Sequence, residues 1–150
     1  MTVTDTARAI SIVQAIGSAS LHLAWSDGTQ ADLDMTDTLK DRAFAALRDP
    51  AEFAKVKIGD WGHGLAWPSG AELGADALWL ETLSDTGHGD VRAFLEWRLR
   101  HALSLSKAAD TLGISRRMVA YYLDGEKKVL KPILLACRGW VVSEGLHQAA

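Results

Sequence analysis

The stretch that most constrains the fold runs from Leu105 to Asp124, LSKAADTLGISRRMVAYYLD. It predicts a helix, a tight turn at Gly113 and a second helix, because glycine accepts the left-handed backbone that such a turn needs. Ala109 is small enough to let the second helix cross close to the first. The inner corner between the helices is predicted to hold Ala108, Leu112, Ile114, Val119 and Tyr122.

The outer side of the second predicted helix is polar and basic. Residues i and i+4 share a helix face, which pairs Arg116 with Ala120 and Arg117 with Tyr121. An arginine can pair with O6 and N7 of guanine or grip phosphate, and the sequence leaves open which arginine does which. Flanking lysines are suited to holding phosphates without reading sequence. The predicted double-stranded DNA contacts are Ser115, Arg116, Arg117, Ala120, Tyr121, Lys107, Lys127 and Lys128. The alternative is a helical hairpin for protein contacts, with solvated arginines.

The charge is divided unevenly between the two halves of the chain. Residues 1–90 carry 6 basic and 14 acidic residues, a net charge of −8, whereas residues 91–150 carry 10 and 5, a net charge of +5. An acidic body with a basic end is the layout expected when one end of the protein faces nucleic acid.

Residues 10–33 predict a three-stranded antiparallel meander. A first strand begins near Ile10, and a second strand places Leu21, Leu23 and Trp25 on one face. Ser26-Asp27-Gly28 is a strong hairpin turn. A returning strand from Thr29 to Leu33 would then turn Ala31 and Leu33 inward.

After the meander, the pattern predicts one helix from Thr36 or Asp37 to about Leu47, stopped by Asp49-Pro50. An edge strand at Val56 and Ile58, a brief strand at 65–67 and a helix at 75–83 follow. The polar residues 85–90 are predicted to be a linker between domains at 1–84 and 91–150.

The second domain is predicted to be all helical. Its first helix covers 91–103, Ser104 and Ser115 cap the next two helices, Gly125 ends the third, and Pro132 starts the last. The fold class is therefore α+β: a small N-terminal α+β domain, an antiparallel meander plus helices, followed by an all-α helix-turn-helix domain.

Residues 8–83 resemble a bacterial domain-of-unknown-function family, number 2442. The resemblance rests on W-S-D-G-T, L-R-D-P-A-E-F and L-A-W-P-S-G-A-E-L, with Glu72 where the family more often has aspartate. It implies a small α+β fold but no activity. Some members of this family occur beside or joined to helix-turn-helix domains, or in gene pairs that look like toxin–antitoxin systems.

Residues 91–142 resemble the lambda-repressor-like, or Xre-type, helix-turn-helix family. The matching positions are Leu103, Ala109, Leu112, Gly113, Ile114, Ser115, Val119, Gly125, Pro132 and Leu135. The resemblance implies that the second helix of the pair enters the major groove. Leu105 departs from the family, which often has a glutamine there that touches the DNA backbone.

The sequence offers little support for an enzyme, a metal site or a cofactor. It contains no H-E-x-x-H, C-x-x-C, G-x-S-x-G or phosphate-binding glycine loop. Asp60, His63 and Trp67 could line a pocket for a small molecule or peptide in the first domain, but a polar loop beside a structural tryptophan is the favoured interpretation. Cys137 reads as a small buried hydrophobe.

We expect a cytoplasmic protein without a membrane segment, because no apolar run reaches about 18 residues, no secretory signal is evident and the single cysteine suits a reducing compartment. The expected function is that of a sequence-specific DNA-binding regulator, acting as a homodimer because one such motif covers few base pairs. The dimer surface could come from the last helix or the N-terminal sheet. The alternative is an antitoxin or protein-interaction module that binds a toxin or other protein through its acidic domain.

Overall fold

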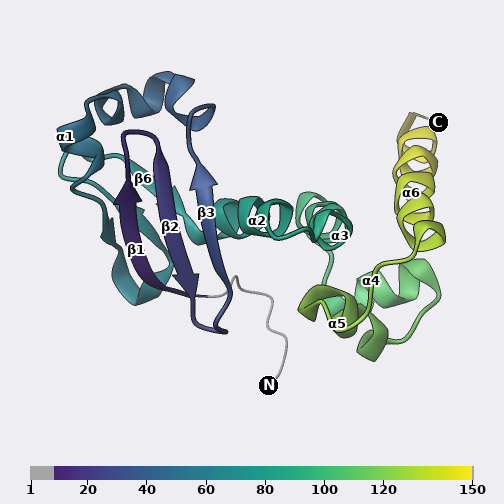
Figure 1. Ribbon diagram of the computed structural model, residues 1–150. Helices are drawn as coiled ribbons and strands as arrows, with labels where there is room; N and C mark the ends of the chain where they lie inside the picture. Colours follow the sequence, from purple (N-terminus) through teal and green to yellow (C-terminus); the bar gives the residue numbers. More distant parts are fainter. Residues whose placement is uncertain (1–8, 150) are drawn as a thin grey trace. The chain divides into compact units, whose positions relative to one another are not determined.

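The structure, a computed structural model, describes residues 9–149. The chain divides into two compact units, one ending at Gly87 and the other beginning at His88. Within the described residues every strand lies in the first unit, and the second unit is helical (Figure 1). The predicted order of an α+β part followed by a helical part is confirmed.

The first sheet is the predicted meander, with β1 (Ile10–Ile16), β2 (Ser20–Trp25) and β3 (Gln30–Asp34) antiparallel in that order. Leu21 pairs with Leu33 and Leu23 with Ala31, and all four side chains are buried. The alternation that was visible in the sequence therefore sets the register, because one face of the sheet is covered.

A second small sheet contains β4 (Lys57–Ile58), β5 (Gly64–Ala66) and β6 (Glu72–Gly74). The strand predicted at 65–67 is present one residue earlier, and β6 was not predicted because three residues around a single leucine carry no periodic signal. Gly64 lets these strands approach closely: a Cβ there would lie 2.6 Å from the carbonyl oxygen of Leu73.

The single helix predicted from Thr36 to Leu47 is wrong. The chain forms two 3₁₀ helices instead, η1 (Thr38–Lys40) and η2 (Arg42–Arg48). Asp41 interrupts them because its backbone is extended and its carboxylate accepts a hydrogen bond from the Ala43 N–H at 2.9 Å. Asp49 then caps α1 (Pro50–Phe53), so the proline starts a new helical turn.

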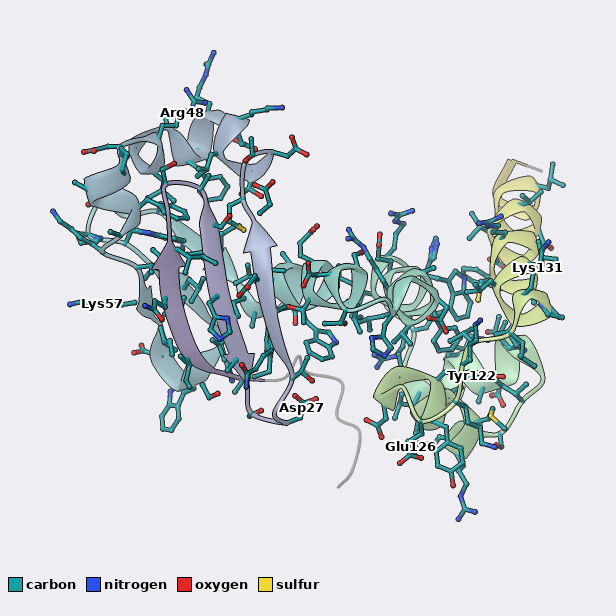
Figure 2. All side chains as sticks on the ribbon, viewed as in Figure 1. Asp27, Arg48, Lys57, Tyr122, Glu126 and Lys131 are labelled. Carbon is teal, nitrogen blue, oxygen red and sulfur yellow. The ribbon has the colours of Figure 1, made fainter. Side chains whose placement is uncertain are left out.

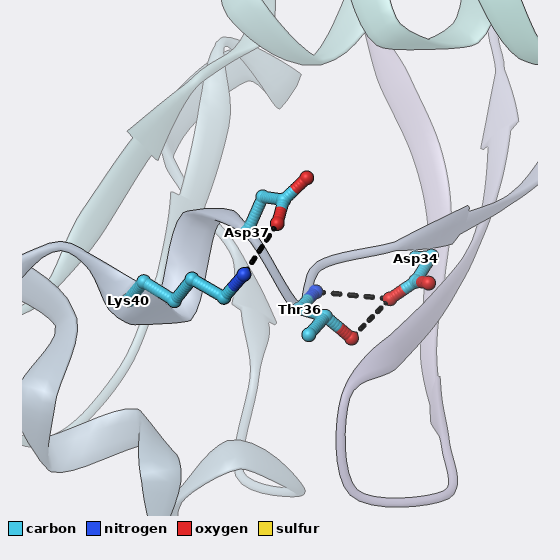
Figure 3. A network of polar contacts seen from close by, with 4 residues as sticks. All are labelled: Asp34, Thr36, Asp37 and Lys40. Atoms are coloured by element: carbon cyan, nitrogen blue, oxygen red, sulfur yellow. Dashed lines mark hydrogen bonds and ion pairs between the residues drawn. The ribbon is translucent and has the colours of Figure 1, made fainter.

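A short polar network orders the chain where it leaves β3 (Figure 3). Asp34 accepts hydrogen bonds from the Thr36 hydroxyl at 2.5 Å and the Thr36 N–H at 2.9 Å, while Asp37 and Lys40 form an exposed ion pair at 3.0 Å. The hydroxyl bond, followed by the N–H bond, lowers the pKa of Asp34 from its ordinary 3.8. Its stabilising contribution is therefore present above that value and is lost as the pH falls through the lowered pKa.

A buried tryptophan of the first sheet, Trp25, is hydrogen-bonded to α2 (Ala75–Asp85) and joins the sheet to this helix. The indole N–H of Trp25 donates to the Thr82 hydroxyl at 3.0 Å, and that hydroxyl donates to the carbonyl of Leu78 at 2.9 Å. The rings of Trp25 and Trp79 meet edge to face with centroids 5.0 Å apart. Sheet and helix thus share one core in which the polar atoms of Trp25 and Thr82 are satisfied.

The substitution Thr82→Val is predicted to destabilise the first unit by about 1–3 kcal/mol, because it leaves the buried Trp25 N–H without an acceptor. Urea unfolding followed by tryptophan fluorescence measures this loss. In a Trp25→Phe background the same substitution should cost clearly less. An equal cost in both backgrounds would show that the hydrogen bond is not the cause.

The second unit consists of α3 (Gly89–Arg100), α4 (Leu105–Leu112), α5 (Arg116–Asp124) and α6 (Lys131–Ala149). The linker predicted at 85–90 is shorter in the structure, because α2 extends to Asp85 and α3 begins at Gly89. The first helix of this unit also ends three residues earlier than predicted. Ala102 adopts a left-handed φ of 51°, and the Leu103 N–H returns to the Arg98 carbonyl at 3.0 Å, which turns Leu103 into the core.

Candidate nucleic-acid interface

The connection between α4 and α5 is short and fully capped. Ser104 accepts a hydrogen bond from the Lys107 N–H, and Ser115 accepts one from the Met118 N–H, each at 3.0 Å. Gly113 ends α4 with φ 70°. Ser104 thus caps the start of α4, while the left-handed Gly113 and the Ser115 cap fix the direction in which α5 leaves the turn.

The buried side of the helix pair holds it against α3. Ala108, Ala109 and Val119 are at most 5% exposed. The ring of Tyr122 (Figure 2) meets Phe94 of α3 edge to face, with centroids 5.5 Å apart. The other predicted corner residues, Leu112 and Ile114, are half-buried.

The candidate DNA-contacting residues lie on the surface of the second unit. Arg116 and Arg117 are exposed in the first turn of α5, Ser115 is exposed before it, and Ala120 and Tyr121 are half-buried on the same helix. Lys107 of α4 is also exposed. The structure thus brings five of the eight candidates together on one short helix and its cap.

The two other lysines follow α5 on an anchored loop. The N–H groups of Glu126 and Lys127 return to the Tyr121 carbonyl at 3.0 and 3.4 Å. Farther along, the buried Val129 donates its N–H to the carboxylate of Asp90 at 2.9 Å. The segment that exposes Lys127 and Lys128 is therefore fixed at both ends.

Sequence reasoning missed the part that Asp90 plays, because this residue was assigned to the linker. It lies instead in the first turn of α3, where a carboxylate is favoured by the helix dipole. Its contact with Val129 spans 39 positions and has no local signal in the sequence. A search for acidic residues in the first turn of a helix would have singled it out, but not its partner.

Lys127 also lies over the ring of Tyr121, with its ammonium 5.8 Å from the ring centroid. This cation–π contact places a positive charge beside the outer part of α5. Leu105, where a backbone-contacting glutamine was expected from the resemblance, is only 8% exposed. Leu105 therefore packs in the core. A polar contact with a DNA backbone would have to come from another residue.

Two hollows in the described part of the chain are alternative candidate sites. In the first unit, a hollow of about 400 Å³ is lined by Asp60 and His63. Trp67 lies outside it, buried, with its indole N–H donating to the Phe53 carbonyl at 3.0 Å. The predicted trio is therefore not one cluster. No group of three or more potential metal ligands occurs among residues 9–149.

In the second unit, a groove of about 530 Å³ runs between α3 and α6 and is lined by Trp97, His101 and Cys137 among others. Burial raises the pKa of the Cys137 thiol to about 11, so the thiol is neutral at ordinary pH. This cysteine has the environment of a packing residue. Within the described part of the chain, each helix is too short or too polar to cross a bilayer.

Comparison with known proteins identifies the family. Residues 10–82 match the model of the family described as "Protein of unknown function (DUF2442)". Residues 10–82 are therefore a DUF2442 domain, which makes up most of the first unit. None of the curated proteins matches the chain.

One solved structure is similar over nearly the whole length. It is that of Putative DNA Binding Protein NE0471 from Nitrosomonas europaea, which is 35% identical to this chain. The similarity has a TM-score of 0.69 and covers 90% of this chain and 87% of the other. The similarity therefore extends beyond the DUF2442 domain into the helical second unit.

The substitution Gly113→Ala is predicted to destabilise the second unit by about 1–2 kcal/mol, because alanine is strained in the left-handed region. A Cβ there meets no atom within 4 Å, so the cost is one of backbone conformation alone. Asparagine at this position should cost less. Thermal unfolding followed by circular dichroism measures both changes.

The matched control is Gly145→Ala within α6, where a Cβ also meets no atom within 4 Å. That change should stabilise the protein by about 0.5–1 kcal/mol. If both alanine variants shift the transition in the same direction, the strain assigned to the turn is not real.

Proposed function

We propose that this protein binds double-stranded DNA through α5 and regulates transcription as a sequence-specific repressor. The observation that carries the proposal is the pair of exposed arginines at the start of α5, on a helix whose other side is buried against α3 and α4. This arrangement supports a helix-turn-helix unit, a class of motif in which the second helix enters the major groove. The similarity to a protein described as a putative DNA-binding protein supports it.

In the proposed complex, the roles of the side chains follow from their chemistry. Arg116 and Arg117 are exposed enough to reach guanine edges, while the small Ala120 lets α5 approach the bases or touch a thymine methyl. Lys107, Lys127 and Lys128 lie on adjoining segments and hold phosphates. The Ser115 oxygen already accepts the cap hydrogen bond, but its O–H is still able to donate to a phosphate oxygen.

The length of α5 limits how much DNA one copy reads. A helix of 9 residues is about 13 Å long and spans about four base pairs. Useful specificity therefore requires two copies on a two-fold-symmetric site. Residues 6–87 carry 6 basic and 12 acidic residues, and their net charge of −6 disfavours phosphate contacts by the first unit, which confines the DNA surface to the second.

The double substitution Arg116→Ala with Arg117→Ala is predicted to reduce binding to DNA selected from a random duplex pool at least about 30-fold. Each lost bidentate contact to guanine costs about 1–3 kcal/mol. Fluorescence anisotropy at several salt concentrations measures the change. The salt dependence of binding should also become shallower, because fewer counterions are released.

The control for this experiment removes two exposed basic residues of the first unit, Arg42→Ala with Lys57→Ala (Lys57 in Figure 2). It changes the net charge equally and should leave binding to the selected DNA within about twofold. Retained binding by the α5 variant, with its fold intact by circular dichroism, would refute the proposal.

A second candidate function belongs to the first unit, which we propose docks a protein partner such as a toxin. Trp61 is 87% exposed and has a left-handed φ of 62°. The adjoining Gly62 packs so tightly on β1 that a Cβ would lie 2.7 Å from the Ile10 carbonyl oxygen. Strained backbone and exposed tryptophan are features of interaction sites, where aromatic anchors contribute most of the affinity.

The substitution Trp61→Ala is predicted to reduce capture of the co-expressed product of the neighbouring gene at least about 10-fold. Quantitative pull-down with the full chain measures this, and Lys57→Ala serves as a surface control. Because Trp61 is exposed, stability and DNA binding should be unchanged. Undiminished capture by the Trp61 variant would remove this candidate.

A further inference from the structure

Helix α6 has apolar residues on two opposite sides, of which the second unit covers only one. On the covered side, Cys137 is buried and Trp140 meets the rings of Trp97 and His101, with centroids 5.8 and 5.0 Å away. On the opposite side, Leu135, Val142 and Leu146 are 50%, 63% and 69% exposed. A helix that is hydrophobic all round is ordinarily buried in its working assembly.

The exposed residues form a regular line along the helix. Leu135, Gly139, Val142 and Leu146 are spaced by four, three and four positions, which is the spacing of the contact line in a two-stranded coiled coil. We call these four residues the α6 seam. The C-terminal turns of α6 stand clear of α5 in Figure 1. Of the four seam residues, Val142 borders the groove between α3 and α6, whereas Leu135, Gly139 and Leu146 lie outside it.

Gly139 adds a geometric feature at the middle of the seam. A Cβ there would meet no atom within 4 Å, so packing inside the unit does not demand glycine. Glycine within a helix also destabilises that helix. What it provides is a notch where a second helix can approach closely.

The charges beside the seam favour a second copy of this chain as the occupant. Lys131 and Arg138 flank the seam on one side, and the neutral Ala136 and Ser143 flank it on the other. In a parallel, two-fold pair, the basic flank of each helix lies against the neutral flank of its partner. Like charges therefore do not meet across this pair, and α6 is complementary to itself.

We infer that the α6 seam is the dimer surface of this protein, pairing α6 with α6 of a second copy in parallel. The inference rests on the proposed function for its purpose: the dimer presents two copies of α5 to one symmetric DNA site, which is incomplete with a single copy. The dimer itself is a property of the protein without DNA.

The size of the seam sets the strength of the dimer. From Leu135 to Leu146 the strip is about 17 Å long and about 10 Å wide, which gives a contact on the order of 200 Å² per protomer. Stable dimers bury about 800 Å² per partner, so this one is weak, with a dissociation constant on the order of 1–100 µM. It becomes strong only when both copies are held on one duplex.

The substitution Val142→Glu is predicted to raise the dimer dissociation constant of the full chain at least about 10-fold, because two carboxylates then face each other across the two-fold axis. Sedimentation over a range of protein concentrations, without DNA, measures it. The control is Leu130→Glu, since Leu130 is 57% exposed but precedes α6 and lies off the seam. It should leave the dimer unchanged.

A second variant tests the register directly. With Val142→Cys, oxidation should link two chains through residue 142, whereas Leu130→Cys should not link them. The buried Cys137 remains as an unreactive background in both variants. A full chain that stays monomeric at 200 µM, or a dimer that Val142→Glu leaves intact, would overturn the inference, and the latter would point to a dimer through the first unit.

The test of the α6 seam and the test of DNA binding can fail independently of each other. The variant Arg116→Ala with Arg117→Ala should still dimerise, since these residues lie on α5. If that variant dimerises normally and also retains DNA binding, the DNA-binding proposal fails while the seam stands. If Val142→Glu leaves the dimer intact and the arginine variant loses DNA binding, the seam fails while the DNA-binding proposal stands.

Discussion

The geometry of the second unit depends on the left-handed turn at Gly113. Its backbone angles end α4 and return the Ile114 N–H to the Ala109 carbonyl at 3.1 Å, after which Ser115 immediately caps α5. A connection this short leaves α5 little freedom of direction. Because Val119 is fully buried against the preceding helices, the first turn of α5 must present Arg116 and Arg117 to solvent.

A hydrogen bond between residues far apart in the sequence fixes the chain that follows α5. Asp90 ties the start of α3 to Val129, beyond the end of α5, and so fixes the segment that exposes Lys127 and Lys128. The chain that follows becomes α6, which packs through Cys137 and Trp140. The carboxylate of Asp90 thus connects the loop that carries Lys127 and Lys128 to the start of α3.

The elements that the sequence predicted well are those whose signals are local. The strands of the meander alternate at Leu21, Leu23 and Trp25, and the helices around Gly113 carry serine caps that need only three neighbouring residues. The elements that were predicted wrongly or missed depend on a competing interaction or on a distant partner. A capping aspartate, Asp41, competes with a helix that periodicity favoured, and β6 exists only because Leu73 pairs with Leu65.

In the candidate site, too, some residues could be predicted from local sequence and others could not. The exposure of Arg116 and Arg117 follows from their positions relative to Val119 and Tyr122, so it could be predicted from spacing alone. The roles of Asp90 and Leu105 could not, because each depends on which distant residues surround it. The exposed side of α6 was equally hard to see: its apolar residues look like core until the structure shows that the core is on the other side. Burial, rather than hydrophobicity, distinguishes a packing face from a binding face, and burial depends on the whole fold.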